Sequence, residues 1–277
     1  MRVLALVLVL LGCGPKPAAC PVMPEVPQGP AFLWKVHKTG GPTLWLFGTV
    51  HDLGIDGVPP QALAALDGAA HFASELGEST ADPDVMRGLT RQKSGPGIDQ
   101  TLPSDDWYDL RDALAGTIEE DALRRARPWY ALILLSQKLS PKAKTSMDVD
   151  LGRRAKAKQL GVDALETWEQ QISALDQVVT VADLSESIRA RGRLRCEPAR
   201  LRAAYRTGDL ELMTALLVVE RTAEPLLWAR NRAWQAKLEG YLAAKGAFVA
   251  VGLAHMLTDK GLPAMLAAAG YTVERAP

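Results

Sequence analysis

The chain has 277 residues, of which 48% are hydrophobic and 23% are charged, so it can bury a full core as one domain or two small ones. Lysine plus arginine and aspartate plus glutamate are equally numerous, at 32 each. This balance gives no reason to expect nucleic acid, an acidic polymer or an anionic lipid surface as a partner, so specificity must come from a local site.

Residues 1–13 have the pattern of an export signal. One basic residue precedes a continuous apolar run that is too short to span a bilayer as a helix. Small residues before Cys13 resemble the bacterial lipobox, in which the signal is removed and the cysteine acquires lipid; an ordinary secretory signal is the alternative. A lipidated Cys13 would hold the protein at a membrane surface without crossing it. Gly14 after the cysteine favours the outer membrane of a bacterial cell envelope.

Residues 14–30 contain six prolines and little that could form a core, which indicates a tether between the anchor and a domain at 31–277. Two cysteines remain after Cys13, at Cys20 and Cys196. Export to an oxidising compartment allows a disulfide between them, although two unpaired thiols are the simpler expectation. Metal binding by two cysteines so far apart is less favoured.

The predicted elements follow from the spacing of apolar residues and from turn-forming residues. In chain order they are a hairpin of strands (32–36 and 43–47), a helix (59–69), a strand (71–75), a mainly helical stretch (82–160), a strand (161–166), a second helical stretch (168–244), a strand (248–251), a helix (260–269) and a strand (271–274).

Strands that alternate with helices imply crossover connections and a largely parallel sheet. We therefore predict an α/β fold with a mixed, mostly parallel sheet built from N- and C-terminal strand–helix units. The helical stretches 82–160 and 168–244 form a large central insertion between these units.

Two strands run directly into the same motif, Gly-x-x-His, at 48–51 and 252–255. In open α/β sheets, ligands bind beyond the carboxyl ends of the strands, and a glycine there lets the backbone turn and a ligand come close. A single motif of this kind is a weak signal, because a histidine at a strand end is more often structural or exposed. Two of them, each after a hydrophobic strand, predict a shared site containing His51 and His255.

Two neutral imidazoles and a carboxylate are a common metal-binding set for zinc, manganese, cobalt or iron, with open positions for a water that becomes a nucleophile. Glu75, at the end of the next strand, is the first candidate for the carboxylate, with a surface acid as an equal alternative. Glu166 has the same strand-end position and is the second candidate. The other acids and histidines near these motifs are expected to be structural, solvent-exposed or helix-capping groups: His37, Asp52, His71 and Asp259.

The chain resembles the TraB/GumN family over nearly all of its length after the tether. The matching features, in order, are the segment 32–36, the turn 48–51, Glu75, Arg127-Pro128-Trp129, the segments 165–167 and 169–171, Arg230-Asn231-Arg232, the segment 248–255, and the closing segments 261–262 and 269–273. Thr258 stands where this family usually has glycine, and Asp52 stands where an apolar residue is commoner. These departures affect the loops more than the proposed ligands.

The resemblance implies an α/β fold related to the TIKI proteins, which are metal-dependent proteases, and more distantly to erythromycin esterases and haem-binding ChaN proteins. It implies His51, Glu75 and His255 as the core of the site. Arg230 and Asn231 would lie at the rim, where an arginine could hold a carboxylate or a developing oxyanion. Glu166 matches a recurrent family position and is expected around the ligands.

Together these features predict a membrane-anchored, metal-dependent hydrolase, most simply a peptidase. A divalent metal (Mn, Co or Zn) held by His51, His255 and Glu75 would activate a water against a peptide or a small ester. Glu75 or Glu166 could instead act as the general base. The alternatives are a non-catalytic protein that binds haem, metal or peptide in the same crevice, a metal-independent His/Glu esterase, and a scaffold with a degenerate site.

Overall fold

The computed structural model describes residues 20, 22–23, 26–51, 53–77, 82–139 and 145–276, with backbone alone for Arg193 and Leu194. The predicted signal 1–13, with its lipidation site Cys13, and Asp52 lie outside the described residues. Within these ranges, no helix has both the length and the apolar character needed to cross a membrane.

A six-stranded sheet forms one part of the molecule, in the order β4-β3-β5-β2-β1-β6. Its strands are β1 (Leu33–His37), β2 (Leu44–Thr49), β3 (His71–Ser74), β4 (Gly161–Ala164), β5 (Ala247–Gly252) and β6 (Thr272–Arg275). The neighbours β4, β3, β5 and β2 run parallel, whereas β1 pairs antiparallel with β2 and with β6. This arrangement confirms the predicted α/β class with a mixed, mostly parallel sheet.

Helices make up most of the rest of the described chain. They are α1 (Pro60–Asp67), α2 (Pro83–Thr90), α3 (Ile98–Thr101), α4 (Ser104–Leu114), α5 (Glu120–Arg124), α6 (Pro128–Leu139), α7 (Met147–Ala157), α8 (Trp168–Val178), α9 (Val181–Arg189), α10 (Arg191–Leu194), α11 (Glu197–Thr207), α12 (Leu210–Leu217), α13 (Glu220–Ala223), α14 (Ala229–Ala243) and α15 (Leu262–Ala268). Three shorter segments are the 3-10 helices η1 (Ile55–Gly57) and η3 (Leu253–Met256) and the π-helix η2 (Glu224–Trp228).

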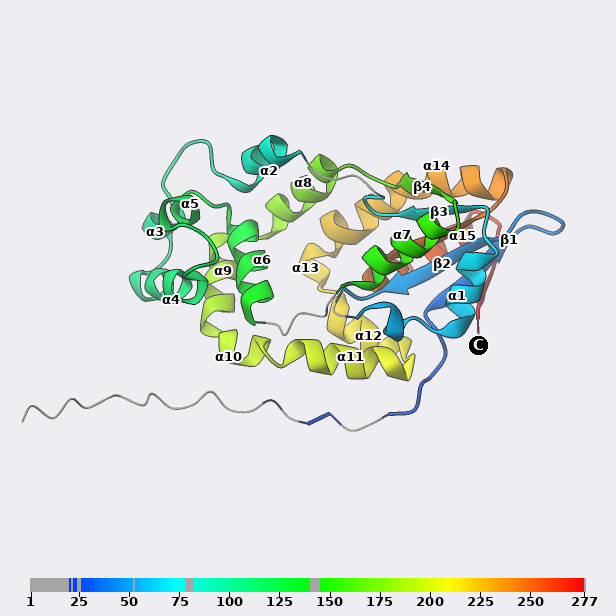
Figure 1. Cartoon of the computed structure of the whole chain (residues 1–277), viewed down its shortest axis with the longest axis horizontal. Coiled ribbons are helices and arrows are strands. Elements are labelled where there is room, and N and C mark those ends of the chain that lie inside the picture. Colours follow the sequence, from blue (N-terminus) through cyan, green and yellow to red (C-terminus); the bar gives the residue numbers. More distant parts are fainter. Residues whose placement is uncertain are drawn as a thin grey trace, which may run out of the picture.

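The helices α3, α4, α5, α6 and α9 of the insertion gather at one end of the molecule and pack around a core of their own (Figure 1). The sheet core contains Phe47, Phe72 and Phe248 among its fully buried side chains. A separate cluster, which includes Leu110 and Ile188, lies between α3, α4, α5, α6 and α9. These helices are therefore a second packed unit beside the sheet, whereas α7, α11, α12 and α14 of the same insertion contribute to the sheet core.

The strands depart from their predicted bounds by one or two residues. The strand predicted at 161–166 ends two residues early, at Ala164. Its pairing with the β3 segment nevertheless continues, because the N–H groups of Leu165 and Glu166 donate to the carbonyls of Ser74 and Glu75. This continued pairing holds Glu166 beside Glu75.

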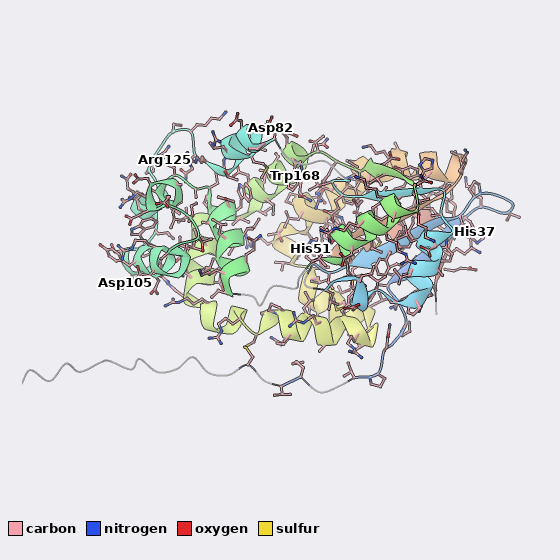
Figure 2. All side chains as sticks on the ribbon, in the orientation of Figure 1. His37, His51, Asp82, Asp105, Arg125 and Trp168 are labelled. Atoms are coloured by element: carbon pink, nitrogen blue, oxygen red, sulfur yellow. A yellow bond between two sulfur atoms is a disulfide. The ribbon has the colours of Figure 1, made fainter. Side chains whose placement is uncertain are left out.

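Cys20 and Cys196 form a disulfide, so the expectation of two unpaired thiols was wrong (Figure 2). Cys196 is the residue that precedes α11, and the Gly29 N–H donates to the Arg206 carbonyl near the other end of that helix. The described part of the predicted tether is thus attached to α11 at two places.

Candidate functional site

Four adjacent parallel strands end at one edge of the sheet, and each leads into a predicted site residue. In the spatial order β4, β3, β5, β2, these residues are Glu166, Glu75, His255 and His51. Carboxyl ends of parallel strands share an edge, so the topology gathers side chains that are up to 204 residues apart in the sequence, from 51 to 255.

The Glu75 carboxylate is fully hydrogen-bonded. Its Oε1 accepts from the Gly252 N–H at 2.9 Å, and its Oε2 accepts from Gln171 Nε2 at 2.9 Å and from Arg230 Nη2 at 2.7 Å. Burial raises the pKa of this carboxyl, but the charges of His255 and Arg230 and the Gly252 N–H outweigh burial and lower the pKa to about 2. Glu75 is therefore ionised at every physiological pH.

Both motif glycines are needed for close approach, not for an unusual backbone angle. A Cβ at Gly252 would lie 3.3 Å from Glu75 Oε1, so glycine lets the carboxylate reach the backbone N–H. A Cβ at Gly48 would lie 2.5 Å from Leu253 Cδ1 and 3.1 Å from Leu253 Cα, so glycine lets η3 pack directly on β2. The two turns are therefore in contact through the first glycine.

Arg230 lies at the centre of the network and joins both carboxylates to the buried histidine. Its Nε and Nη2 donate to Glu166 at 2.9 and 2.5 Å, and its Nη2 also donates to Glu75. Its Nη1 donates to the Leu226 carbonyl at 2.7 Å and lies 3.1 Å from His255 Nε2. Leu226 belongs to the π-helix η2, which continues into α14 and so sets where Arg230 projects.

The predicted position of Arg230 and Asn231 at the rim was wrong. Asn231 is 1% exposed, and the Arg230 side chain is 14% exposed. Glu166, expected around the ligands, is also buried, and its carboxylate accepts from Arg230. The reason is that α14 packs over the ends of the strands, so these side chains point inward.

His255 is held in one orientation and one tautomer. The Asn231 amide donates through Nδ2 to the carbonyls of His255 and Lys260, which leaves its Oδ1 to accept from His255 Nδ1 at 2.7 Å. The unprotonated Nε2 then faces Arg230 as an acceptor. The ring also packs on Trp234, with 4.6 Å between the ring centroids.

The imidazole of His255 is neutral. Burial lowers its pKa most, the charges of Arg230 and His51 lower it further, and Glu75 raises it, with a net value of about 3. At the acid pH where Glu75 would titrate, His255 is itself becoming protonated. The positive charge of His255 then lowers the pKa of Glu75, and the negative charge of Glu75 raises the pKa of His255.

His51 lies in a different environment from His255. Its side chain is 74% exposed, and its Nδ1 lies 2.8 Å from Asp148 Oδ2 on the first turn of α7. The Thr49 hydroxyl donates to the other oxygen of Asp148 at 2.6 Å. Figure 2 places His51 between the sheet and the inserted helices.

His51 and Glu75 share a pocket of about 680 Å³ between the sheet edge, α7 and α8. Its wall also contains Asp148, Gln171 and Trp168. A cavity of this size fits a ligand as large as a short peptide segment.

A model of the TraB/PrgY/gumN family matches residues 32–275, which is nearly the whole chain. The chain belongs to the TraB/PrgY/gumN family. Searches of curated proteins and of solved structures gave no significant match.

The donor chemistry of this family member fits a divalent metal in part. His51 and His255 each have Nδ1 bound to an oxygen of another side chain, which is how metal-ligating histidines are usually oriented, and Glu75 supplies an ionised carboxylate 3.9 Å from His255 Nε2. However, in the described residues no group of three or more His, Cys, Asp or Glu side chains is gathered as a metal site. Arg230 also contacts His255 Nε2.

His71 and Asp259, expected to be structural or surface groups, lie outside this network. Two members of the network, Asp148 and Gln171, were not predicted from the sequence. His71 Nδ1 is buried with no hydrogen-bond partner in the described structure, and Asp259 is exposed. Asp148 has no local signal beyond its place after the N-cap Ser146, and Gln171 lay in a segment that resembles the family without any assigned role.

Proposed function

We propose that this TraB/PrgY/gumN family member is a metal-dependent hydrolase of peptides or small esters, anchored in the cell envelope through lipid on Cys13. The observation that carries the proposal is the pair of imidazoles at neighbouring strand ends. Each has Nδ1 held by an oxygen acceptor, Asp148 for His51 and Asn231 for His255, beside the ionised Glu75.

The balance of buried charge supports a cation at this edge. Glu75 and Glu166 carry two negative charges, Arg230 carries one positive charge, and His255 is neutral. Buried carboxylates are stable only when paired, so the remaining negative charge of this group favours a further cation.

His51, Glu75 and His255 are the side chains that would hold the metal. When bound, a divalent metal supplies a water with a pKa lowered towards ~7 and polarises the substrate carbonyl. Gln171 and the Gly252 N–H orient the Glu75 carboxylate, and Asn231 keeps the His255 lone pair on Nε2.

The low pKa of Glu75 limits the acid–base role that this carboxylate can take. A general base works best with a pKa near the working pH, and a pKa of about 2 makes Glu75 a poor proton acceptor. Its low pKa supports a role as an anionic ligand instead. Arg230, whose N–H groups face Glu75, Glu166, the Leu226 carbonyl and His255, would keep Glu75 ionised beside the metal.

The test is elemental analysis of the purified protein together with a hydrolysis assay on a peptide and ester library. We expect a bound divalent metal, activity lost with chelator and restored by Mn, Co or Zn, and loss of both metal and activity in His51→Ala. His37→Ala, which changes a histidine on β1 outside this network, is the matched control and should keep both. A metal content unchanged by His51→Ala would contradict the proposal.

The contact between Arg230 Nη1 and His255 Nε2 favours a second candidate, a hydrolase that needs no metal. Here the guanidinium binds the developing oxyanion, and His51, oriented by Asp148, takes the proton from water. Activity that survives chelation but is lost in Asp148→Asn would favour this candidate. Stoichiometric ligand binding with no turnover on the library would exclude both hydrolases.

A further inference from the structure

The side of the molecule formed by α10 and α11 carries a concentration of arginines that the zero net charge of the chain conceals. We propose that this basic face, consisting of Arg195, Arg202 and Arg206, lies on the membrane and binds anionic lipid headgroups. The inference goes beyond the hydrolase site, and it rests on the lipid anchor proposed at Cys13.

The local charge is strongly positive. Between residues 191 and 207 there are six arginines and one acid, Glu197. Arg191 is paired with Asp109, and Arg200 is paired with Glu197. In the part of the chain that the structure describes, the guanidinium groups of Arg195, Arg202 and Arg206 have no hydrogen-bond or ion-pair partner. Unpaired guanidinium groups at the surface are suited to bind phosphate oxygens.

The disulfide fixes which side of the molecule is nearest to the anchor. Cys20 is bonded to Cys196, at the start of α11, and only seven residues lead from Cys13 to Cys20. Seven residues span at most about 25 Å even when fully extended. A lipid on Cys13 therefore holds the start of α11 within about 30 Å of the bilayer, because the disulfide adds the 5.3 Å between the Cα atoms of Cys20 and Cys196.

The following segment keeps the same side close to the anchor. The Gly29 N–H donates to the Arg206 carbonyl at 2.8 Å, so the chain runs along α11 before it enters the sheet. The bottom edge of the molecule in Figure 1, where α10 and α11 lie beside the N-terminal segment, is the side that faces the membrane in this arrangement.

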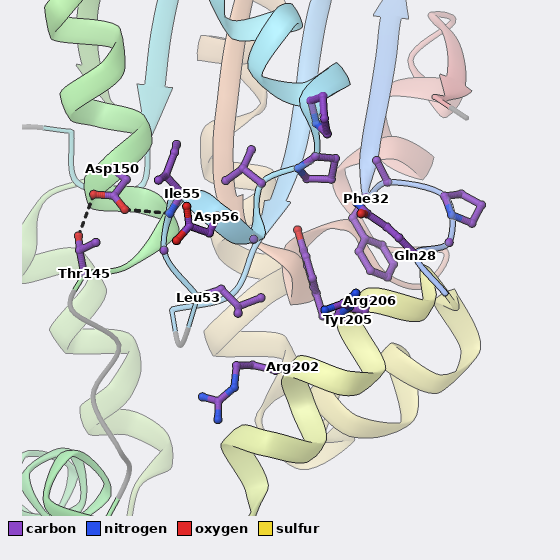
Figure 3. Close-up of a pocket in the computed structure, with 18 residues that line it drawn as sticks. Gln28, Phe32, Leu53, Ile55, Asp56, Thr145, Asp150, Arg202, Tyr205 and Arg206 are labelled. Carbon is purple, nitrogen blue, oxygen red and sulfur yellow. Dashed lines mark hydrogen bonds between the residues drawn. The ribbon is translucent and has the colours of Figure 1, made fainter. Parts of the chain in front are cut away.

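A cavity of about 890 Å³ opens beside this helix and offers room for a headgroup (Figure 3). Arg202 and Arg206 line it, with the apolar side chains of Leu53 and Ile55 on another wall. Asp150, which also lines the cavity, is already bonded to the Ile55 N–H and the Thr145 hydroxyl, as the dashed lines show. Asp56 and Asp150 place two carboxylates on this cavity, equal in number to its two arginines, so a headgroup phosphate would bind on the arginine wall.

Each arginine near an anionic surface strengthens binding about fivefold at low ionic strength, because about 1 kcal/mol corresponds to that ratio at 25 °C. The attraction falls off within a Debye length, which is ~10 Å at 0.1 M salt. Three arginines should therefore contribute roughly a hundredfold preference for anionic over zwitterionic vesicles, and salt should weaken it.

The test uses the full chain with Cys13→Ser, so that covalent lipid cannot mask the contribution of the face. Binding to vesicles of phosphatidylcholine alone is compared with binding to vesicles that also contain phosphatidylglycerol. We expect a strong preference for phosphatidylglycerol at low salt, and a loss of roughly a hundredfold in that preference in the triple variant Arg195→Gln, Arg202→Gln and Arg206→Gln. Because both chains keep the same apolar N-terminus, the ratio isolates the arginines.

A matched triple variant, Arg87→Gln, Arg91→Gln and Lys245→Gln, removes the same charge from exposed positions at α2 and after α14, on the opposite side in Figure 1. It should keep the preference. Equal losses in the two triple variants would overturn the proposal, and so would a preference abolished by inorganic phosphate but not by chloride at the same ionic strength, which would indicate a phosphate pocket. Metal content and hydrolysis are separate readouts, so failure of the proposed function would be distinguished from failure of this one.

Discussion

The two Gly-x-x-His turns have the same spacing and follow adjacent parallel strands, yet they place their histidines in opposite environments. His255 is 3% exposed and packs under α14, between Asn231, Arg230 and Trp234. His51 is mostly exposed and contacts α7 through Asp148. A local motif fixes where a side chain begins, but the elements packed over the strand end decide its burial and its hydrogen-bond partners.

The two turns therefore contribute to the site in different ways. The turn at 252–255 supplies a fixed donor within a network that also holds Glu75 and Glu166. The turn at 48–51 supplies a donor that faces the pocket and is oriented by one carboxylate. We therefore expect loss of the His255 side chain to affect folding and chemistry together, and loss of the His51 side chain to affect chemistry alone.

The largest effect is expected for Arg230→Met, on the buried side of this comparison. The variant leaves Glu75 and Glu166 as uncompensated buried carboxylates, and breaking a buried pair of this kind costs about 3–5 kcal/mol. Urea denaturation measures the free energy of unfolding. A loss below about 1 kcal/mol would mean that the network is not the main support of this edge.

The two histidines provide the direct comparison. His255→Ala should cost about 2–4 kcal/mol, because it leaves a cavity beside Trp234 and an unpaired oxygen on Asn231. His51→Ala should change the unfolding free energy by less than about 0.5 kcal/mol, as is usual for exposed residues. Both should lose hydrolysis. Similar stability losses in the two variants would remove the distinction between the turns.

The two glycines are expected to reverse the order of the stability effects predicted for the two histidines, because Gly48 is the more tightly packed of the pair. Gly48→Ala forces a Cβ to 2.5 Å from Leu253 Cδ1, and overpacking of this kind costs about 1–3 kcal/mol. Gly252→Ala places a Cβ 3.3 Å from Glu75 Oε1, so it should cost about 1 kcal/mol and displace the carboxylate from the backbone N–H. Denaturation and hydrolysis are measured on both. We expect the larger stability loss in Gly48→Ala and the larger activity loss, relative to stability, in Gly252→Ala.

The pH dependence of stability tests the burial of His255 without any substitution. The pKa of His255 falls from 6.5 when unfolded to about 3 when folded, so the unfolded chain binds more protons between these values. Stability is therefore lost as the pH drops from 6.5 towards 3, by up to about 1.4 kcal/mol per pH unit. Glu75, with a pKa lowered from 4.5 to about 2, adds to the loss only below pH 4.5.

Denaturation between pH 6.5 and 4.5 isolates the His255 contribution. His255→Gln should flatten the curve over this range, whereas His51→Gln should leave its slope as it is. The opposite result would assign the titrating imidazole to the exposed turn.

The balanced net charge of the chain conceals a local concentration of positive charge. A chain with equal numbers of acids and bases gives no sign of an anionic partner, yet its arginines are concentrated on α10 and α11. Two arginines at the edge of this concentration are paired with the neighbouring helix α4, Arg189 with Asp106 and Arg191 with Asp109. Net charge therefore describes the chain without describing its surfaces.

The sequence by itself determined the elements, the α/β class and the strand-end positions of His51, Glu75, Glu166 and His255, because alternation, helical spacing and turn residues act over short distances. Only the tertiary structure decided that Arg230 lies inside the site, that Asp148 orients His51, and that Cys20 pairs with Cys196. These contacts join residues separated by 155, 97 and 176 positions. Crossover topology and the packing of α7, α11 and α14 bring them together, and no local pattern records that packing.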